Sequence, residues 1–319
     1  MTGTGTQQDP FVISNWADFI TAVGTTDAYV EFPKNIHRTR DIDVNPNKLY
    51  IDEYGVVQTN VQPSDLRNLY ENTFKLDANS SDGFPEGLPT TIAINCAEIN
   101  AYGATVINLA SSTVDLFTNN KSMCVLSNLA LLNFNVDGHA VINTAQVLQC
   151  FYCIFSGRVK NNTSSRITAF GRNQLDLNSP MVSCSFNIIM EGNIDLFDYI
   201  YIDFNTYGGL HRNCRIEVHK TNNENSVGGT FATLGDNSYY TGDISGINNA
   251  IVFTNTSQYN IVEIDSATAS LSKSGNISLV LVNTDIFTSN NITGNFNLVD
   301  TQTLGDANAL LTLGFPIET

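Results

Sequence analysis

Charged residues are scarce in this sequence, and basic residues are the scarcest. Asp, Glu, Lys and Arg together make up 14 % of its 319 residues, against roughly 25 % in an average globular protein. The 15 Lys and Arg are outnumbered by 31 Asp and Glu, so the net charge is −16. The one basic cluster, at residues 34–40, is followed at once by Asp41 and Asp43. Because neutralising phosphates requires clustered Lys and Arg, we expect no nucleic-acid partner.

Long apolar runs are also lacking. No stretch approaches the roughly 18 consecutive apolar residues that a membrane-spanning helix needs. The first residues, Met-Thr-Gly-Thr-Gly-Thr, have neither the basic region nor the apolar region of a signal peptide. We therefore expect no insertion into a membrane, and we expect the chain to be made and folded in a cytoplasm.

The sequence does contain a series of short, β-rich apolar runs that end in Asn or Gly. The clearest runs are residues 123–134, 147–157, 181–192 and 210–220. Cysteines recur with them at intervals of about 26–34 residues, at Cys96, Cys124, Cys150 with Cys153, Cys184 and Cys214. Recurrence at roughly 20–50 residues indicates a solenoid or another repeat architecture.

The cysteines themselves have several interpretations. In apolar runs a free cysteine behaves as a small hydrophobic residue, so we favour buried, reduced thiols that mark successive coils. Disulfides between adjacent coils are a weaker alternative. A metal site is weaker still, because Cys150 and Cys153 form one C-x-x-C and zinc sites usually show two. We expect no metal and no cofactor.

A helix is predicted near the start of the chain. Asn15 can cap it, and Gly24 can end it. The apolar residues between them recur at helical spacing and form one face: Trp16, Phe19, Ile20 and Val23. At the start of a solenoid such a helix would cover the open end, whose apolar interior and unpaired strand edges otherwise invite aggregation.

These patterns divide the chain into four parts. Residues 1–33 are expected to be an N-terminal cap and attachment segment, and residues 34–89 an irregular, charged insertion. Residues 90–227 are expected to be the β-helix body. Residues 228–319 are expected to form either further coils or a small β domain with a terminal tail, including a short helix at 306–313.

Strands at intervals of about 8–15 residues, with no long helix between them, predict an all-β sandwich, barrel or solenoid. The recurring cysteines, the cap helix and the Asn residues at strand ends favour the solenoid. The predicted fold is therefore all-β: a right-handed parallel β-helix with an N-terminal cap helix and a C-terminal β region that can be less regular.

Three stretches resemble the parallel β-helix (pectate-lyase-like) structural proteins of bacteriophage virions, such as fibres, tailspikes and head or tail appendages. The first is Gly-Thr-Gly-Thr-x-x-Asp-Pro-Phe-x-Ile at residues 3–13, with the helix and the Ala-Tyr-Val-Glu-Phe-Pro that follow it. The others are residues 91–107 and 306–317. The resemblance implies location in the virion, other virion proteins as partners, and an exposed rod that can meet a glycan of the host surface. Residues 34–75 depart from the family pattern, and no catalytic residue carries over.

The favoured function is therefore that of a non-enzymatic virion component: an appendage, fibre or decoration subunit. Symmetric association along the rod, for example as a trimer, would bury an apolar lateral face. Two alternatives stay open: a tailspike-type polysaccharide depolymerase, and a glycan-binding receptor module without hydrolysis.

Candidate site residues follow from these alternatives. Glycoside hydrolysis needs two carboxylates roughly 5 Å or 6.5–9.5 Å apart, and the densest set of acids is Glu191, Asp195, Asp198 and Asp203. Tyr199 and Tyr201 share strand parity with Asp203 and could stack on a sugar ring. Arg212 and Arg215 follow about one coil later and could supply the base that pectate-lyase chemistry requires. The simpler interpretation is an exposed coil face whose acids keep the rod soluble.

Overall fold

The computed structural model describes most of the chain. The described residues are 1–39, 49–51, 57–58, 70–80, 83–86, 90–119, 123–144, 147–165, 167–170, 181–197, 211–212, 214–221, 230–232, 235–236, 239–243, 249–253, 258–265, 271–273, 278–287, 292–294, 296–315 and 317–318. They form a largely β structure in which parallel strand pairs dominate, so the all-β prediction is confirmed.

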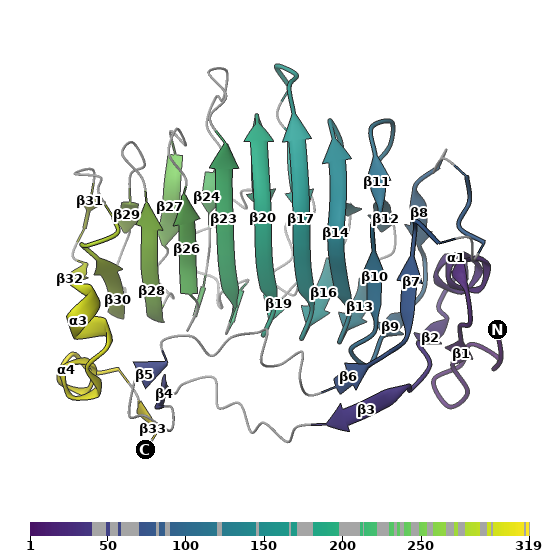
Figure 1. Ribbon diagram of the computed structural model, residues 1–319, viewed down its shortest axis with the longest axis horizontal. Coiled ribbons are helices and arrows are strands. Elements are labelled where there is room, and N and C mark those ends of the chain that lie inside the picture. The colour runs from purple at the N-terminus through teal and green to yellow at the C-terminus, as the bar shows by residue number, and fades with distance from the viewer. Residues whose placement is uncertain are drawn as a thin grey trace.

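Most of the described parallel strands form three ladders, which we number for reference. Ladder one consists of β7 (Lys75–Asp77), β10 (Thr105–Ile107), β14 (Ala130–Asp137), β17 (Ile154–Asn161), β20 (Ser185–Gly192), β23 (Arg215–Thr221), β26 (Tyr239–Asp243), β28 (Gln258–Asp265), β30 (Ser278–Asn283) and β32 (Asn297–Val299). In Figure 1 its strands run side by side across the molecule.

Ladder two consists of β1 (Phe11–Val12), β2 (Tyr29–Glu31), β9 (Glu98–Asn100), β13 (Met123–Ser127), β16 (Val147–Phe151), β19 (Met181–Val182), β22 (His211–Arg212) and β25 (Gly235–Asp236), and it joins ladder one at β28. A short strand, β11 (Ala110–Ser111), pairs with the second half of β14.

Ladder three begins with β8 (Ile92–Ile94), β12 (Phe117–Asn119), β15 (Ile142–Thr144), β18 (Ile167–Phe170) and β21 (Ile194–Phe197). Beside β21 lies a further parallel sheet of β24 (Thr230–Ala232), β27 (Asn249–Phe253), β29 (Leu271–Lys273) and β31 (Ile292–Thr293). From β13 to β21 the chain visits ladders two, one and three in the same order three times.

The core lies between the ladders and is built from residues that stack in register. On ladder one, alternate side chains point inward, as the period of two in a strand requires. Phe155 pairs with Phe186, and their rings stack with centroids 5.0 Å apart. Ile216 and Tyr240 continue the same column, and both are fully buried. We call the strands at one level of the ladders, one from each ladder, a rung. Each rung therefore buries the apolar side chains of the next rung.

The corner between ladders two and one explains the spacing of several cysteines. Asn128, Tyr152 and Ser183 occupy this corner with φ of 54°, 57° and 55°, a left-handed conformation that turns the chain sharply. The residue after each is buried; two of them, Cys153 and Cys184, stack on successive rungs. The next rung places Cys214 at the same corner, where the backbone amide of residue 215 donates to the Cys184 carbonyl at 3.0 Å.

All six cysteines are buried and none forms a disulfide. Burial raises the pKa of the Cys184 thiol, as do its neighbours Cys153 and Cys214. The interpretation of the cysteines as buried, reduced thiols is therefore confirmed. Cys96 and Cys124 lie elsewhere in the core, so only part of the cysteine recurrence marks one corner.

The predicted N-terminal helix is present as α1 (Trp16–Gly24), at one end of the ladders (Figure 1). Asn15 is its N-cap, and the Asn15 side chain accepts a hydrogen bond from the Asp18 amide at 2.9 Å. Trp16, Phe19 and Val23 are buried in the main core. The helix lies against β8, the first strand of ladder three.

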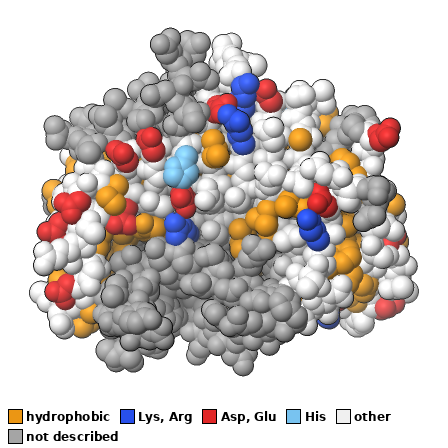
Figure 2. All heavy atoms as spheres, in the orientation of Figure 1, with side chains coloured by type: hydrophobic (Ala, Val, Ile, Leu, Met, Phe, Trp, Pro, Cys, Tyr) orange, Lys and Arg blue, Asp and Glu red, His pale blue; other side chains and the backbone are white. Residues whose placement is uncertain are grey.

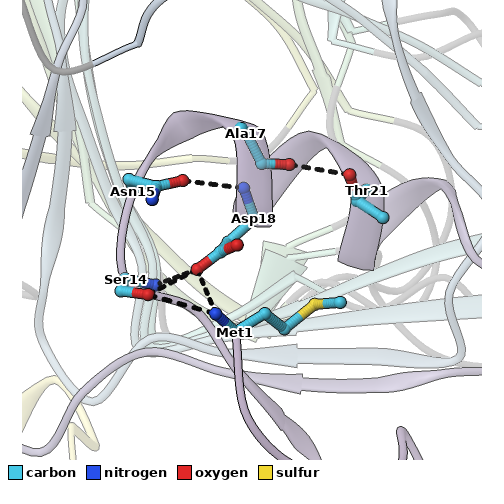
Figure 3. Close-up of polar contacts among 6 residues, drawn as sticks. All are labelled: Met1, Ser14, Asn15, Ala17, Asp18 and Thr21. Atoms are coloured by element: carbon cyan, nitrogen blue, oxygen red, sulfur yellow. Dashed lines mark hydrogen bonds and ion pairs between the residues drawn. The ribbon is translucent and has the colours of Figure 1, made fainter.

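Asp18 ties the entrance of α1 to the first residue (Figure 3). Its carboxylate accepts hydrogen bonds from the Met1 ammonium at 2.5 Å, from the Ser14 amide at 3.0 Å and from the Ser14 hydroxyl. The ammonium and Ser14 together hold the pKa of Asp18 below its ordinary value of 3.8.

The segment from 34 to 89 contains strands as well as irregular chain. β3 (Ile36–Thr39) pairs antiparallel with β6 (Tyr70–Asn72), and β4 (Leu49–Ile51) pairs antiparallel with β5 (Val57–Gln58). β7, which also falls in this segment, is the first strand of ladder one. Ladder one thus starts before residue 89, where we placed the boundary between the insertion and the β-helix body. That domain boundary stays a prediction.

Residues 113–116, between β11 and β12, form no strand. There the chain bends, and strand pairing resumes only at Phe117 in β12. The Ser111 hydroxyl accepts hydrogen bonds from the amides of Thr113 and Val114, at 3.4 and 3.2 Å. Serine side chains that bond nearby backbone amides compete with strand pairing in this way.

Two short helices follow the last strand of ladder one: α3 (Thr301–Leu304) and α4 (Ala307–Thr312). α4 confirms the expected terminal helix, and Asp306 caps it. A second, smaller core joins these helices to the outer side of ladder one: Ile261, Leu281, Val299, Leu304, Leu310 and Phe315. The chain then ends in β33 (Ile317–Glu318).

Successive rungs approach so closely at Gly192 that there is no space for a side chain. A Cβ at this position would lie 2.0 Å from the Asn161 carbonyl oxygen, and φ is +88°. We expect Gly192→Ala to lower the free energy of unfolding by about 1–3 kcal/mol more than Gly138→Ala. Gly138 has φ of +77° but open space around it, so it controls for backbone strain alone. Equal losses in chemical denaturation of the two variants would contradict rung packing at Gly192.

A second prediction concerns pH. Because folding lowers the pKa of Asp18, its carboxylate stabilises the fold above the unfolded-state value of 3.8, and this contribution disappears as pH falls through the folded-state pKa. We expect Asp18→Asn to lower the melting temperature at pH 7, and the gap from the natural chain to shrink steadily below pH 4. Melting curves at several pH values measure this gap; a gap independent of pH would refute the role of Asp18.

Candidate functional site

The structure describes only part of the carboxylate set that the sequence singled out. Glu191 lies at the end of β20, where its side chain is buried and forms an ion pair with Arg158 of β17. Asp195 lies on β21, but its side chain is not among those described. The other candidates lie outside the described residues: Asp198, Tyr199, Tyr201 and Asp203. Their joint action stays a prediction.

A different group of polar side chains gathers on the outer face of ladder one. Along β23, Ile216 and Val218 are buried, so the alternation of the strand turns Arg215, Glu217 and His219 outward. Side chains from the next three strands extend the group. We call it the outer polar cluster: Arg215, Glu217, His219, Tyr239, Glu263 and Asn283. Figure 2 shows acidic, basic and histidine side chains on this face.

Glu217 is the centre of the first half of the cluster. Its two carboxylate oxygens contact Arg215 Nη2 and His219 Nε2, each at 2.9 Å. Partial burial alone would raise the pKa of Glu217, but the contacts with His219 and Arg215 outweigh it and hold the pKa below its ordinary value. Glu217 is therefore fixed as an anion between two donors.

Glu263 is the centre of the second half. It accepts a hydrogen bond from the Tyr239 hydroxyl and another from Asn283 Nδ2, the latter at 2.7 Å. Burial, together with the negative charge of Glu263, raises the pKa of the Tyr239 phenol far above its ordinary value. The Arg215 guanidinium lies 5.5 Å from the centroid of the Tyr239 ring and joins the two halves.

The register shows how the two carboxylates are spaced. Glu217 pairs with Thr241, and Thr241 pairs with Glu263. Two rung spacings of about 4.8 Å separate their backbones, roughly 10 Å in all. The cluster therefore offers two fixed carboxylates, a phenol and hydrogen-bond donors on one outer surface, a set of groups that can bind a polar, hydroxyl-rich ligand.

Sequence reasoning noticed Arg215 as a site candidate but missed Glu217, Tyr239 and Glu263. A usable signal was present within β23: Arg-x-Glu-x-His at residues 215–219 has the period of two that places all three on one strand face. Nothing in the sequence pairs Glu217 with Glu263, because that depends on the length of the chain between rungs.

A second polar group lies at the α1 end of ladder two. The Tyr102 hydroxyl donates to Glu31 at 2.5 Å, and Lys34 Nζ lies 3.2 Å from the same carboxylate and 4.4 Å from the Tyr102 ring centroid. Burial, with the nearby charge of Glu31, raises the pKa of Glu98. These contacts hold the chain after β2 against the turn after β9.

Two absences apply to the described part of the chain. Within it, no three or more His, Cys, Asp or Glu side chains come together in a way that could hold a metal ion. No helix among these residues is both long and apolar enough to span a membrane.

Comparison with known proteins adds no relationship. No protein-family model matches the chain, and the searches of curated proteins and of solved structures find no significant match.

The bond between Tyr239 and Glu263 can be tested by removing one hydroxyl. We expect Tyr239→Phe to lower the free energy of unfolding by about 1–2 kcal/mol, because Glu263 is partly buried and loses a donor. Tyr29→Phe is the matched control, because Tyr29 is half-buried in ladder two. Removing the Tyr29 hydroxyl should lower the free energy of unfolding by less than about 0.5 kcal/mol. Urea denaturation measures both, and equal effects would show that the bond contributes little.

Proposed function

We propose that the chain is a right-handed parallel β-helix that serves as a non-enzymatic structural component of a bacteriophage virion. The observation that carries the fold is the repeated order of the three parallel ladders, each paired in register with its neighbours. One rung made of one strand per ladder, stacked on the next, is a β-helical coil. Parallel crossover connections are right-handed in about 98 % of cases, which gives the hand.

The dimensions suit a stiff rod. Ladder one contains the strands from β7 to β32, and its neighbours lie about 4.8 Å apart, so the stack is roughly 43 Å long. One end is covered by α1, and the other carries α3 and α4 (Figure 1). Helix α1 packs into the main core at the first strands, and α3 and α4 add a second core on the outer side of ladder one at the last strands.

The virion context rests on the resemblance of residues 3–13, 91–107 and 306–317. The first of these stretches has a clear structural purpose. A Cβ on Gly3 would lie 1.9 Å from the Pro10 carbonyl oxygen, and one on Gly5 would lie 2.5 Å from the Phe11 ring. Gly5 also accepts a hydrogen bond from the Tyr29 amide at 2.9 Å. The motif thus folds a tight loop onto the first strands of ladder two.

In this role the partners are other virion proteins. We propose that the rod is an appendage, fibre or decoration subunit, that residues 1–33 take part in its attachment, and that it forms a homo-oligomer such as a trimer. The outer faces are then available to the host surface.

Association with particles tests the proposal directly. We expect an antibody against the chain to detect it in particles purified on a density gradient from a lysate of the source culture, at a constant ratio to the major capsid protein. The antibody signal should persist after a high-salt wash, while a host cytoplasmic enzyme used as control stays at the top of the gradient. Recovery of the chain only at the top of the gradient would refute the virion role.

The outer polar cluster favours a second candidate, contact with a host-surface glycan, with or without cleavage. Its carboxylates Glu217 and Glu263, with Tyr239 between them in the contact network, are the groups such contact would use. Incubation with surface polysaccharide of the host, followed by a reducing-end assay, distinguishes cleavage from binding. A Glu217→Gln/Glu263→Gln variant that retains cleavage would exclude this cluster as the catalytic pair.

A further inference from the structure

The segment between β2 and β7 leaves and re-enters the ladders at one place. Its stem is the antiparallel pair β3–β6, with Thr39 opposite Tyr70. The Thr73 amide donates to the Asn35 carbonyl at 3.1 Å, and Asn72 Nδ2 donates to the Pro33 carbonyl at 2.8 Å. These bonds fix the stem beside β7, the first strand of ladder one.

The tip of the same segment lies at the opposite end of the molecule. Figure 1 shows β3 and β6 on the α1 side, whereas β4 and β5 lie beside α4 and β33. β4 pairs antiparallel with β5 on one edge and parallel with β33 on the other, where Leu49 is opposite Ile317 and Tyr50 is opposite Glu318. Strands from the two extremes of the chain thus share one small sheet.

β33 is itself held in place by the second core. Leu310 of α4 and Phe315, two residues before β33, are both buried. They pack in one cluster with Ile261 and Leu281 of ladder one. α4 also lies against β33. The chain that reaches Ile317 is therefore fixed to the last rungs before it pairs with β4.

The β4–β5 hairpin depends on this third strand. Its strands contain three and two residues, and an isolated two-stranded hairpin is at best marginally stable in water. We propose that β33 acts as a clasp: it holds the β4–β5 hairpin at the α3–α4 end, away from the β3–β6 stem on the α1 side. Loss of β33 pairing then releases the tip while the ladders stay folded.

Cross-linking tests the geometry in the full chain. The paired residues Leu49 and Ile317 lie one strand spacing apart, about 4.8 Å, within the Cα separation of about 4.4–6.8 Å that a disulfide spans. We expect Leu49→Cys/Ile317→Cys to form a disulfide under mild oxidant at least tenfold faster than Leu49→Cys/Met123→Cys. Met123 is an exposed residue of β13 in ladder two. Equal rates in the two variants, measured by peptide mass spectrometry, would overturn the proposal.

Hydrogen exchange tests the consequence. Proline has no amide hydrogen, so Ile317→Pro/Glu318→Pro removes the donors of β33. We expect the amides of β4 and β5 to exchange roughly tenfold faster, while those of β17 and β20 are unchanged. Leu311→Ala, at an exposed position of α4, should alter neither set. Unchanged exchange in β4 and β5 would overturn the clasp, and the cross-linking result decides the matter if the proline variant does not fold.

Discussion

Parallel strands hold the ladders together, and the packing of the core follows from the register in which these strands pair. Each rung offers its neighbour a row of backbone donors and acceptors and an apolar column to pack against, as in the stack of Phe155 on Phe186. A parallel ladder buries its backbone groups only while strands continue to be added, so both ends of the stack need another solution. The pairing also fixes which residues become neighbours across the surface.

The two ends are treated differently. At the first rungs, α1 places Trp16 and Phe19 directly into the main core. At the last rungs, α3 and α4 pack on the outer side of ladder one and form a separate small core with Leu281 and Val299. Helix α1 therefore covers the interior at its end of the stack. Helices α3 and α4 instead add a layer outside ladder one and position the chain that leads to β33. The clasp that we propose between β33 and β4 depends on this second arrangement.

The side chains of the outer polar cluster hold one another in place. Glu217 and Glu263 each accept bonds from two side chains, and Arg215 joins the two groups through the Tyr239 ring. Such a network costs less to desolvate than isolated charges would, since each carboxylate keeps donors when a ligand displaces water. Such a network is compatible with the contacts to virion proteins or a glycan that we propose.

Local features whose causes lie within a few residues could be predicted from the sequence. Asn15 and the apolar face of residues 16–23 predicted α1, Asp306 and its neighbours predicted α4, and the recurring cysteine-bearing runs predicted stacked β-strands with reduced thiols in the core. Which distant residues lie together became evident only from the fold. The placement of Glu217 and Glu263 two strands apart on one face depends on unequal chain lengths between rungs, and the pairing of Leu49 with Ile317 joins residues that are far apart in the sequence. The register of each strand is set by which of its residues are buried and by the geometry of the corners before it. Register between distant strands depends on every rung between them, so no local pattern of residues predicts it.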